Sequence, residues 1–141
     1  MLPRRHRLHI ARDVQRVSRT GRPVAALDLT IRFLPNRLPI VRATVVAGLK
    51  VSKRSTKRNR AKRLIREVLR RHLPSIRPGM DLVITAKPSI LGKEYADISA
   101  EIGNALHRAH LLCGLWVDIH TTHEQKPGIS APVSANNDKM S

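Results

Sequence analysis

Residues 49–70 read LKVSKRSTKRNRAKRLIREVLR, which predicts an amphipathic helix from about Lys57 to Leu73, ended by Pro74. At about 100° per residue, the apolar side chains of this helix gather in one arc: Ala61, Leu64, Ile65, Val68 and Leu69. The opposite arc is basic and contains Asn59, Arg63, Arg66 and Arg70, flanked by Arg60, Lys62 and Arg71. Glu67 is the only acidic residue of the helix and can pair with Arg63 or Arg71, one turn away. The helix therefore has one face suited to a core and one suited to a polyanion.

Alternating apolar and polar residues before this helix predict two strands. In residues 25–34, one face carries Leu27, Leu29, Ile31 and Phe33, and the other carries Asp28, Thr30 and Arg32. In residues 41–51, one face carries Val41, Ala43, Val45, Ala47, Leu49 and Val51, and the other carries Arg42, Thr44 and Lys50. We expect the two strands to form an antiparallel pair with one polar face.

Further elements follow from periodicity on both sides. Residues 9–19 predict a short helix with a stop at Gly21, and residues 94–112 predict a second amphipathic helix. Residues 80–87 contain three consecutive apolar residues and predict a strand buried on both faces. The order helix, strand, strand, helix, strand, helix predicts an α+β domain in which helices cover a sheet. We assign this domain to residues 1–113 and a disordered C-terminal tail to residues 114–141.

Positive charge dominates the composition. The 141 residues include 27 Lys plus Arg against 10 Asp plus Glu, a net charge of +17. Residues 1–73 hold 21 of the basic and only 3 of the acidic residues. Folding does not require such an excess, and its self-repulsion opposes compaction, so the first half of the chain predicts a polyanionic partner, either nucleic acid or an anionic membrane surface.

Several other classes of protein fit the sequence poorly. The single cysteine, Cys113, permits no intrachain disulfide, and no apolar run approaches the roughly 20 residues of a membrane span. The first 22 residues are rich in arginine, as in an organellar transit peptide, but they lead directly into a strand pattern. Neither a constellation of His with carboxylates nor an acidic cluster for two metal ions is visible in the sequence. We therefore assign no catalytic residues and no metal ligands.

Residues 49–70 strongly resemble the signature of the bacterial ribonuclease P protein family. That signature has a lysine-rich strand end and a short linker, then an Arg-Asn-Arg core that begins a basic helix. The matching residues here are Lys50 and Lys53, Arg58-Asn59-Arg60, Lys62-Arg63 and Arg66-Glu67. RLHIARDVQRVSRTGR, residues 7–22, is similar to the family's opening helix, and GMDLVITAKPS, residues 79–89, to its strand after the basic helix. The resemblance spans about residues 5–112.

The resemblance implies a fold and a function. The fold would be an α/β sandwich with a mixed sheet of about four strands, three helices and a left-handed βαβ crossover containing the basic helix. A small-subunit ribosomal protein domain has the same topology. The function would be that of the protein subunit of ribonuclease P, a cytoplasmic ribonucleoprotein endonuclease in which the RNA is the catalyst. The protein would bind the catalytic RNA and the 5′ leader of precursor tRNA, would hold no cofactor itself, and would work in a holoenzyme that contains Mg²⁺.

Two groups of site residues follow from the resemblance. The contacts to the catalytic RNA would be Lys53, Arg54, Lys57, Arg58, Asn59, Arg60, Lys62, Arg63, Arg66 and Arg70. The leader cleft would be formed by Val14, Ser18, Thr30, Arg32, Arg42 and Lys50, with Val17 beside them. Arginine's planar fork suits phosphates, and each neutralised phosphate releases counterions. The family often has aromatic residues at the positions of Val14 and Ser18, so base stacking there is reduced in this chain.

Two alternative functions compete with this interpretation. A ribosomal or ribosome-associated RNA-binding protein of the same topology would have no enzymatic role. A DNA-binding protein would use residues 57–73 as a recognition helix, but that arrangement needs a preceding helix and a tight turn, and here a strand leads into the basic helix. We therefore expect neither DNA nor a membrane as the partner.

Overall fold

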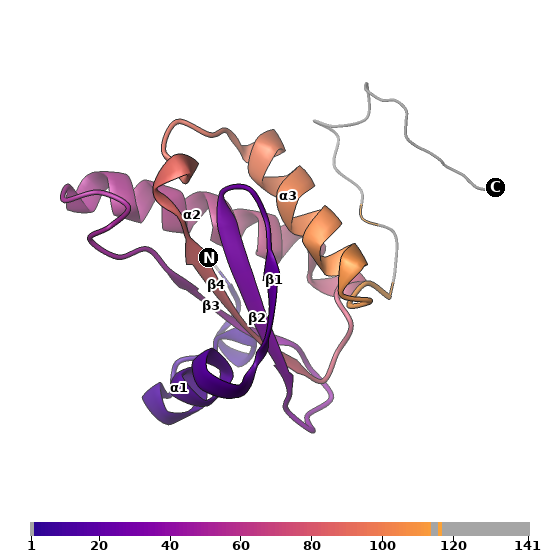
Figure 1. The fold of residues 1–141 in the computed structure, drawn as a ribbon. Coiled ribbons are helices and arrows are strands. Elements are labelled where there is room, and N and C mark those ends of the chain that lie inside the picture. Colours follow the sequence, from indigo (N-terminus) through magenta and orange to yellow (C-terminus); the bar gives the residue numbers. More distant parts are fainter. Residues whose placement is uncertain (1, 114–115, 117–141) are drawn as a thin grey trace.

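The computed structural model describes residues 2–113 and Trp116. The described residues form one mixed sheet between two layers of helix (Figure 1). The strands are β1 (Arg22–Ala25), β2 (Leu29–Pro35), β3 (Arg42–Val46) and β4 (Met80–Ala86), in the spatial order β1-β2-β4-β3. The α-helices are α1 (Ala11–Thr20), α2 (Ser55–His72) and α3 (Tyr95–Arg108). Short 3₁₀ turns are η1 (Arg4–His6), η2 (Leu73–Ser75) and η3 (Pro88–Ile90).

The order of the strands corrects one prediction from the sequence. β2 and β3 do not pair with each other, because β4 lies between them, antiparallel to β2 and parallel to β3. β4 is the strand with buried residues on both faces, as its consecutive apolar residues predict, because α2 and α3 cover one face and α1 covers the other. The connection from β3 to β4 through α2 is the expected parallel βαβ crossover.

The start of β2 also differs from the alternation pattern. β1, an edge strand that contains Pro23, forms a hairpin with β2, and the sequence pattern did not predict it. Leu27 and Asp28 fall in the turn of this hairpin, so Leu27 is 73% exposed and Asp28 is fully buried, the reverse of their predicted sides. Gly21 is required just before β1, because a Cβ there would lie 2.3 Å from the Val17 carbonyl oxygen.

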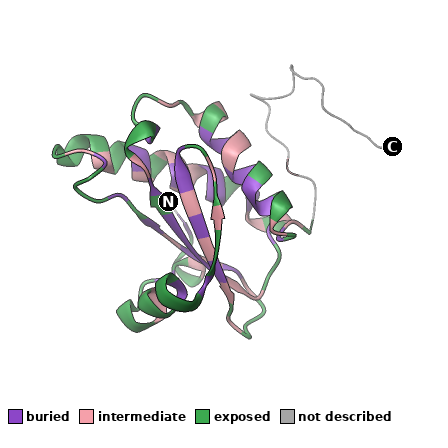
Figure 2. Cartoon of the chain, viewed as in Figure 1, coloured by how far each residue is buried: buried purple, intermediate pink, exposed green. Residues whose placement is uncertain are grey.

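The main core lies between the sheet and the pair α2 and α3 (Figure 2). The predicted apolar arc of α2 faces this core: Ala61, Ile65, Val68 and Leu69 are buried, and Leu64 packs against them. Each such large aliphatic side chain contributes about 1.5–3 kcal/mol by leaving water. Leu49 was predicted to join this core but is 71% exposed, because β3 ends at Val46 and residues 47–54 form a loop.

α1 packs on the opposite face of the sheet. Val17 is fully buried there against Leu8 and Val83, with Val14 and Leu34 at the edge of the cluster. This second, smaller core covers only part of the face that carries the polar residues of β2 and β3. The remainder of that face is open, and this determines where a ligand can lie.

The helix ends follow local chemistry. α3 begins with a capping box in which Glu94 and Asp97 bond each other's backbone N–H groups, so it starts close to the predicted residue 94. It ends at Arg108, although the sequence predicts residue 112. Two residues later His110 takes a left-handed conformation with a φ of 60°, which is typical just after a helix end. No helix in residues 2–113 has the length and apolar character that crossing a membrane requires.

Trp116 lies against the C-terminal end of α2. Its ring stacks on His72 with centroids 3.9 Å apart and planes 10° from parallel. Gly103 of α3 makes room for it, because a Cβ at that position would lie 2.6 Å from the indole nitrogen. Apart from Trp116, the predicted tail of residues 114–141 lies outside the described residues.

Candidate nucleic-acid interface

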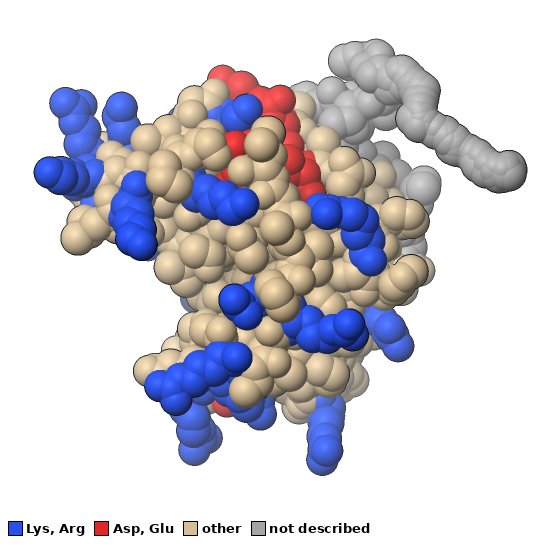
Figure 3. Space-filling view, viewed as in Figure 1, with Lys and Arg blue, Asp and Glu red and all other residues tan. Residues whose placement is uncertain are grey.

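The basic surface of α2 and its preceding loop is the first part of the candidate interface. Lysine and arginine side chains project around the start of α2 and around α1 (Figure 3). Among the predicted RNA contacts, the exposed residues are Lys53, Arg54, Lys57, Asn59, Arg60, Arg63 and Arg70, and the half-buried ones are Arg58, Lys62 and Arg66. The structure therefore brings all ten onto one helix and one loop.

Arg58 braces the loop that leads into α2. Its Nη1 donates to the carbonyl oxygens of Ser52, at 2.8 Å, and Lys53, at 3.0 Å. The Ser52 hydroxyl in turn accepts a hydrogen bond from the backbone N–H of Arg54 at 3.1 Å. These bonds fix the backbone of the linker between β3 and α2. Arg58 thus positions the neighbouring cations as well as adding its own charge.

Charge on α2 is unevenly compensated. Glu67 accepts hydrogen bonds from Arg70 and Arg71, each with an Nε–O distance of 3.0 Å, so the predicted pair with Arg71 is present. Arg63, the other predicted partner, forms no such pair, and Arg70 takes its place. Hydrogen bonds from Arg70 above all, and then from Arg71, lower the pKa of Glu67 to about 2. Free cationic charge is therefore concentrated on the first three turns of α2.

The second part of the candidate interface is on the sheet face that α1 packs against. It is the half of that face that α1 leaves uncovered. Here Thr30 of β2 lies opposite Thr85 of β4, and Val46 of β3 flanks Thr85 on the other side. Arg32 and Thr44 flank Val83 in the next row. α1 covers the far end of the face through Val17, while Ser18 remains exposed. The open half therefore combines hydroxyl groups, one guanidinium and a little aliphatic surface.

Lys50 lies apart from these strand residues. It was predicted on the polar face of the second strand, but it falls in the loop after β3 and is exposed. It therefore belongs with the cations that precede α2.

Arg42 is held by an internal ion-pair network. Its Nε and Nη2 donate to the two carboxylate oxygens of fully buried Asp81, at 2.8 and 2.7 Å. Asp13 of α1 lies 3.7 Å from the same guanidinium, and Arg16 of α1 lies 3.6 Å from Asp81. The hydrogen bonds with Asp81 raise the pKa of Arg42 despite its burial. Arg42, predicted as a cleft residue, thus fastens α1 to the sheet.

Sequence reasoning missed two sets of residues. Asp81 was not singled out, because only the strand order reveals that it faces Arg42. The exposed arginines of α1 were also missed, although their spacing of four and three residues places them on one helix face: Arg12, Arg16 and Arg19. Among the described residues, no group of three or more His, Cys, Asp or Glu could hold a metal ion.

Comparison with known proteins places this geometry in a family. The family model described as Ribonuclease P matches residues 2–110. The ribonuclease P protein component of a Synechococcus strain is 35% identical over 123 residues, covering 84% of this chain and 92% of the relative. The component from Chloroflexus aggregans is 33% identical over 132 residues, covering 93% of this chain and 90% of the relative.

Solved structures agree with the sequence relatives. The Thermotoga maritima RNase P protein, in a complex with 1-(4-fluorophenyl)-2-thiourea, superimposes with a TM-score of 0.67 at 25% identity, covering 72% of this chain and 98% of that chain. The Staphylococcus aureus RNase P protein superimposes with a TM-score of 0.68 at 22% identity, covering 75% of this chain and 96% of that chain. This likeness supports the fold.

Proposed function

Because the chain belongs to the ribonuclease P protein family, it is a protein subunit of the endoribonuclease that matures tRNA 5′ ends, and we propose that its α2 surface binds the catalytic RNA. The observation that carries the proposal is the charge imbalance on α2. Glu67 pairs with two arginines near the end of the helix, whereas the cations before it carry only one ion pair among the described residues, the loose contact of Arg60 with Glu94. Phosphates are the ligands that such a surface suits, through arginine forks and counterion release.

The 5′ leader of precursor tRNA is proposed to lie on the open half of the sheet face beside α1. Thr30 and Arg32 lie on that face, and Ser18 and the exposed arginines of α1 are on the helix that covers the rest of it. The structure offers few aromatic platforms there, since Phe33 is in the main core and Tyr95 lies under Arg71, whose guanidinium carbon is 5.1 Å from the ring centroid. Leader binding would then depend on phosphate contacts and hydroxyl groups more than on stacking.

The catalytic step is proposed to belong to the RNA subunit, with Mg²⁺ bound by that RNA, and the setting to be the cytoplasm. The protein would contribute affinity by reducing the repulsion between two polyanions. The ribosomal alternative has no support from the family match, and the DNA-binding alternative lacks a helix and tight turn before α2, where β3 and a loop stand.

Reconstitution tests the proposal directly. Protein freed of RNA, ribonuclease P RNA alone and the two together are compared for cleavage of precursor tRNA at the mature 5′ end. We expect no cleavage by the protein and improved cleavage by the mixture at low Mg²⁺, where charge repulsion is least screened. Cleavage by the purified protein, or no effect of adding it to the RNA, would refute the proposal.

A further inference from the structure

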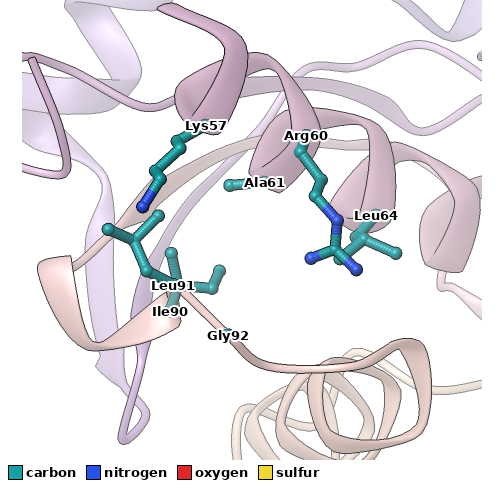
Figure 4. Close-up of a pocket in the computed structure, with 7 residues that line it drawn as sticks. All are labelled: Lys57, Arg60, Ala61, Leu64, Ile90, Leu91 and Gly92. Atoms are coloured by element: carbon teal, nitrogen blue, oxygen red, sulfur yellow. The ribbon is translucent and has the colours of Figure 1, made fainter. Parts of the chain in front are cut away.

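A pocket opens between α2 and the loop that follows β4. Its cavity volume is about 200 Å³, and it is lined by Lys57, Arg60, Ala61, Leu64, Ile90, Leu91 and Gly92. Figure 4 shows the empty space between the two walls, with Lys57 and Arg60 extending on either side of it. Drug-sized ligands occupy pockets of roughly 300–1,000 Å³. A pocket of this size suits a single compact group.

Both walls of the pocket are preformed. α2 supplies one wall, where Ala61 is buried in the main core. The other wall is fixed by backbone hydrogen bonds, from Ile90 N–H to the Lys87 carbonyl at 3.0 Å and from Lys93 N–H to the Ile90 carbonyl at 3.1 Å. Gly92 has a φ of +84° and no atom within 4 Å of an added Cβ. Glycine is therefore required for the turn, because of its positive φ.

The chemistry of the walls is apolar inside and cationic outside. Ala61 and Ile90 form a buried apolar floor, with Leu64 and Leu91 beside them. Arg60 is paired only loosely, 3.6 Å from Glu94, and both side chains are at least half exposed. Such a surface pair contributes little and can exchange for another anion. An apolar slot with a cation on each side fits a flat ring that carries an anionic group on each side.

We propose that this pocket receives one unpaired nucleobase of the catalytic RNA, with Lys57 and Arg60 binding the phosphates that flank it. This inference rests on the proposed function, because the surrounding α2 cations are those assigned to that RNA. Single-stranded loops and bulges can turn out a base, whereas a base stacked in a duplex cannot enter. The pocket would thus recognise one position of the RNA, which phosphate contacts alone do not do.

A filling substitution tests the pocket without changing charge. Ala61→Met places a flexible, helix-compatible side chain at the pocket floor. Ala100→Met, at a partly exposed alanine of α3, is the matched control. Leu91→Phe narrows the pocket from the exposed loop, so the test stands even if Ala61→Met fails to fold in a thermal melt. Binding to ribonuclease P RNA is titrated against salt, and base reactivity is mapped by chemical probing.

We expect native protein to protect the pairing edge of one unpaired base. Ala61→Met and Leu91→Phe should lose that protection and bind roughly 5- to 150-fold more weakly, the range expected for the loss of one bound base. Their salt slope should match that of the native protein, whereas Lys57→Ala should reduce it by about 0.7. Ala100→Met should bind as the native protein does.

The pocket inference is overturned if folded Leu91→Phe binds with native affinity and leaves the footprint unchanged. It is also overturned if affinity falls but no base changes reactivity, because the lining would then serve another contact. Failure of the proposed function has a different signature, in which native protein neither binds the RNA nor improves cleavage.

Discussion

Single residues on α2 divide between the core and the RNA surface within one helical turn. Arg63 is exposed, Arg66 is half-buried, and Ile65 between them is fully buried. Arg63→Ala and Arg66→Ala should each weaken RNA binding and reduce its salt slope by a little under one unit, while the free energy of unfolding changes by about 0.5 kcal/mol or less. Ile65→Ala should lower stability by about 2–5 kcal/mol and leave the slope unchanged. Thermal melts and salt-titrated binding measure both quantities.

Native affinity and native salt slope in both arginine variants would identify the basic arc as a solvated surface and remove α2 from the interface.

The apolar arc of α2 could be predicted from the sequence because it depends only on helical periodicity. The pairing of Glu67 could be predicted only in part, because three arginines lie within reach and the rotamers select Arg70 and Arg71.

A carboxyl pair at the β1–β2 turn makes stability depend on pH. The backbone N–H of buried Asp28 donates to Glu101 of α3 at 2.8 Å, and Lys93 lies 3.7 Å from the Asp28 carboxylate. Burial, followed by the neighbouring Asp28 carboxyl group, raises the pKa of Glu101 to about 7, although the Asp28 backbone N–H acts in the opposite direction. Burial tends to raise the pKa of Asp28 as well, but the nearby polar groups of Glu101 and Ser89 and the Lys93 charge outweigh it and lower that pKa.

The raised pKa of Glu101 sets the direction of the effect. Folding favours the protonated form, so its contribution is complete below the ordinary pKa of 4.5 and is lost as pH rises through about 7. The melting temperature of the native protein should therefore fall between pH 5 and pH 8. Glu101→Gln keeps an acceptor for Asp28 but does not titrate, so its melting temperature should vary less over that range. Equal pH dependence in the two proteins would contradict this assignment.

At the scale of elements, the ion pair of Arg42 on β3 and Asp81 on β4 is the anchor for α1, whose Asp13 and Arg16 each pair with one of its members. Arg42 is only 18% exposed and Asp81 is fully buried, so removing the arginine leaves a carboxylate without its main partner. We expect Arg42→Ala to lower the free energy of unfolding by about 3–5 kcal/mol. The double variant with Asp81→Ala should lose less than the two single variants combined, because neither charge is then stranded. Urea denaturation of the four proteins measures the coupling energy.

Additive losses in that cycle would show that Arg42 and Asp81 do not stabilise each other. The elements differ in how far the sequence alone predicts them. α2 and β4 have periodicities that stand alone. The insertion of β4 between β2 and β3 depends on long-range pairing, and local alternation carries no information about it.

At the scale of the whole molecule, the two faces of the sheet have different proposed roles. The layer of α2 and α3 closes the main core and carries the surface proposed for the catalytic RNA, and the opposite face, half covered by α1, is left for the leader. The fold class and the basic arc could be predicted from the sequence because each depends on repeated pattern. Three features could not be predicted from the sequence, because each joins residues far apart in the chain: the partner of Arg42, the pocket beside η3 and the packing site of Trp116.

The end of the chain offers a test of where the domain stops. Trp116 stacks on His72 and fits over Gly103, so Trp116→Ala should lower stability by more than about 1 kcal/mol through lost packing. Residues 118–141 lie outside the described residues, are polar, and add almost no net charge. Removing them should change the free energy of unfolding by less than about 1 kcal/mol and leave RNA affinity and salt slope unchanged. Urea denaturation and RNA titration of the two variants separate these effects. A cooperative loss of stability in the truncated protein would place the boundary of the domain beyond Trp116, because only packing against the described core makes a segment contribute to global unfolding.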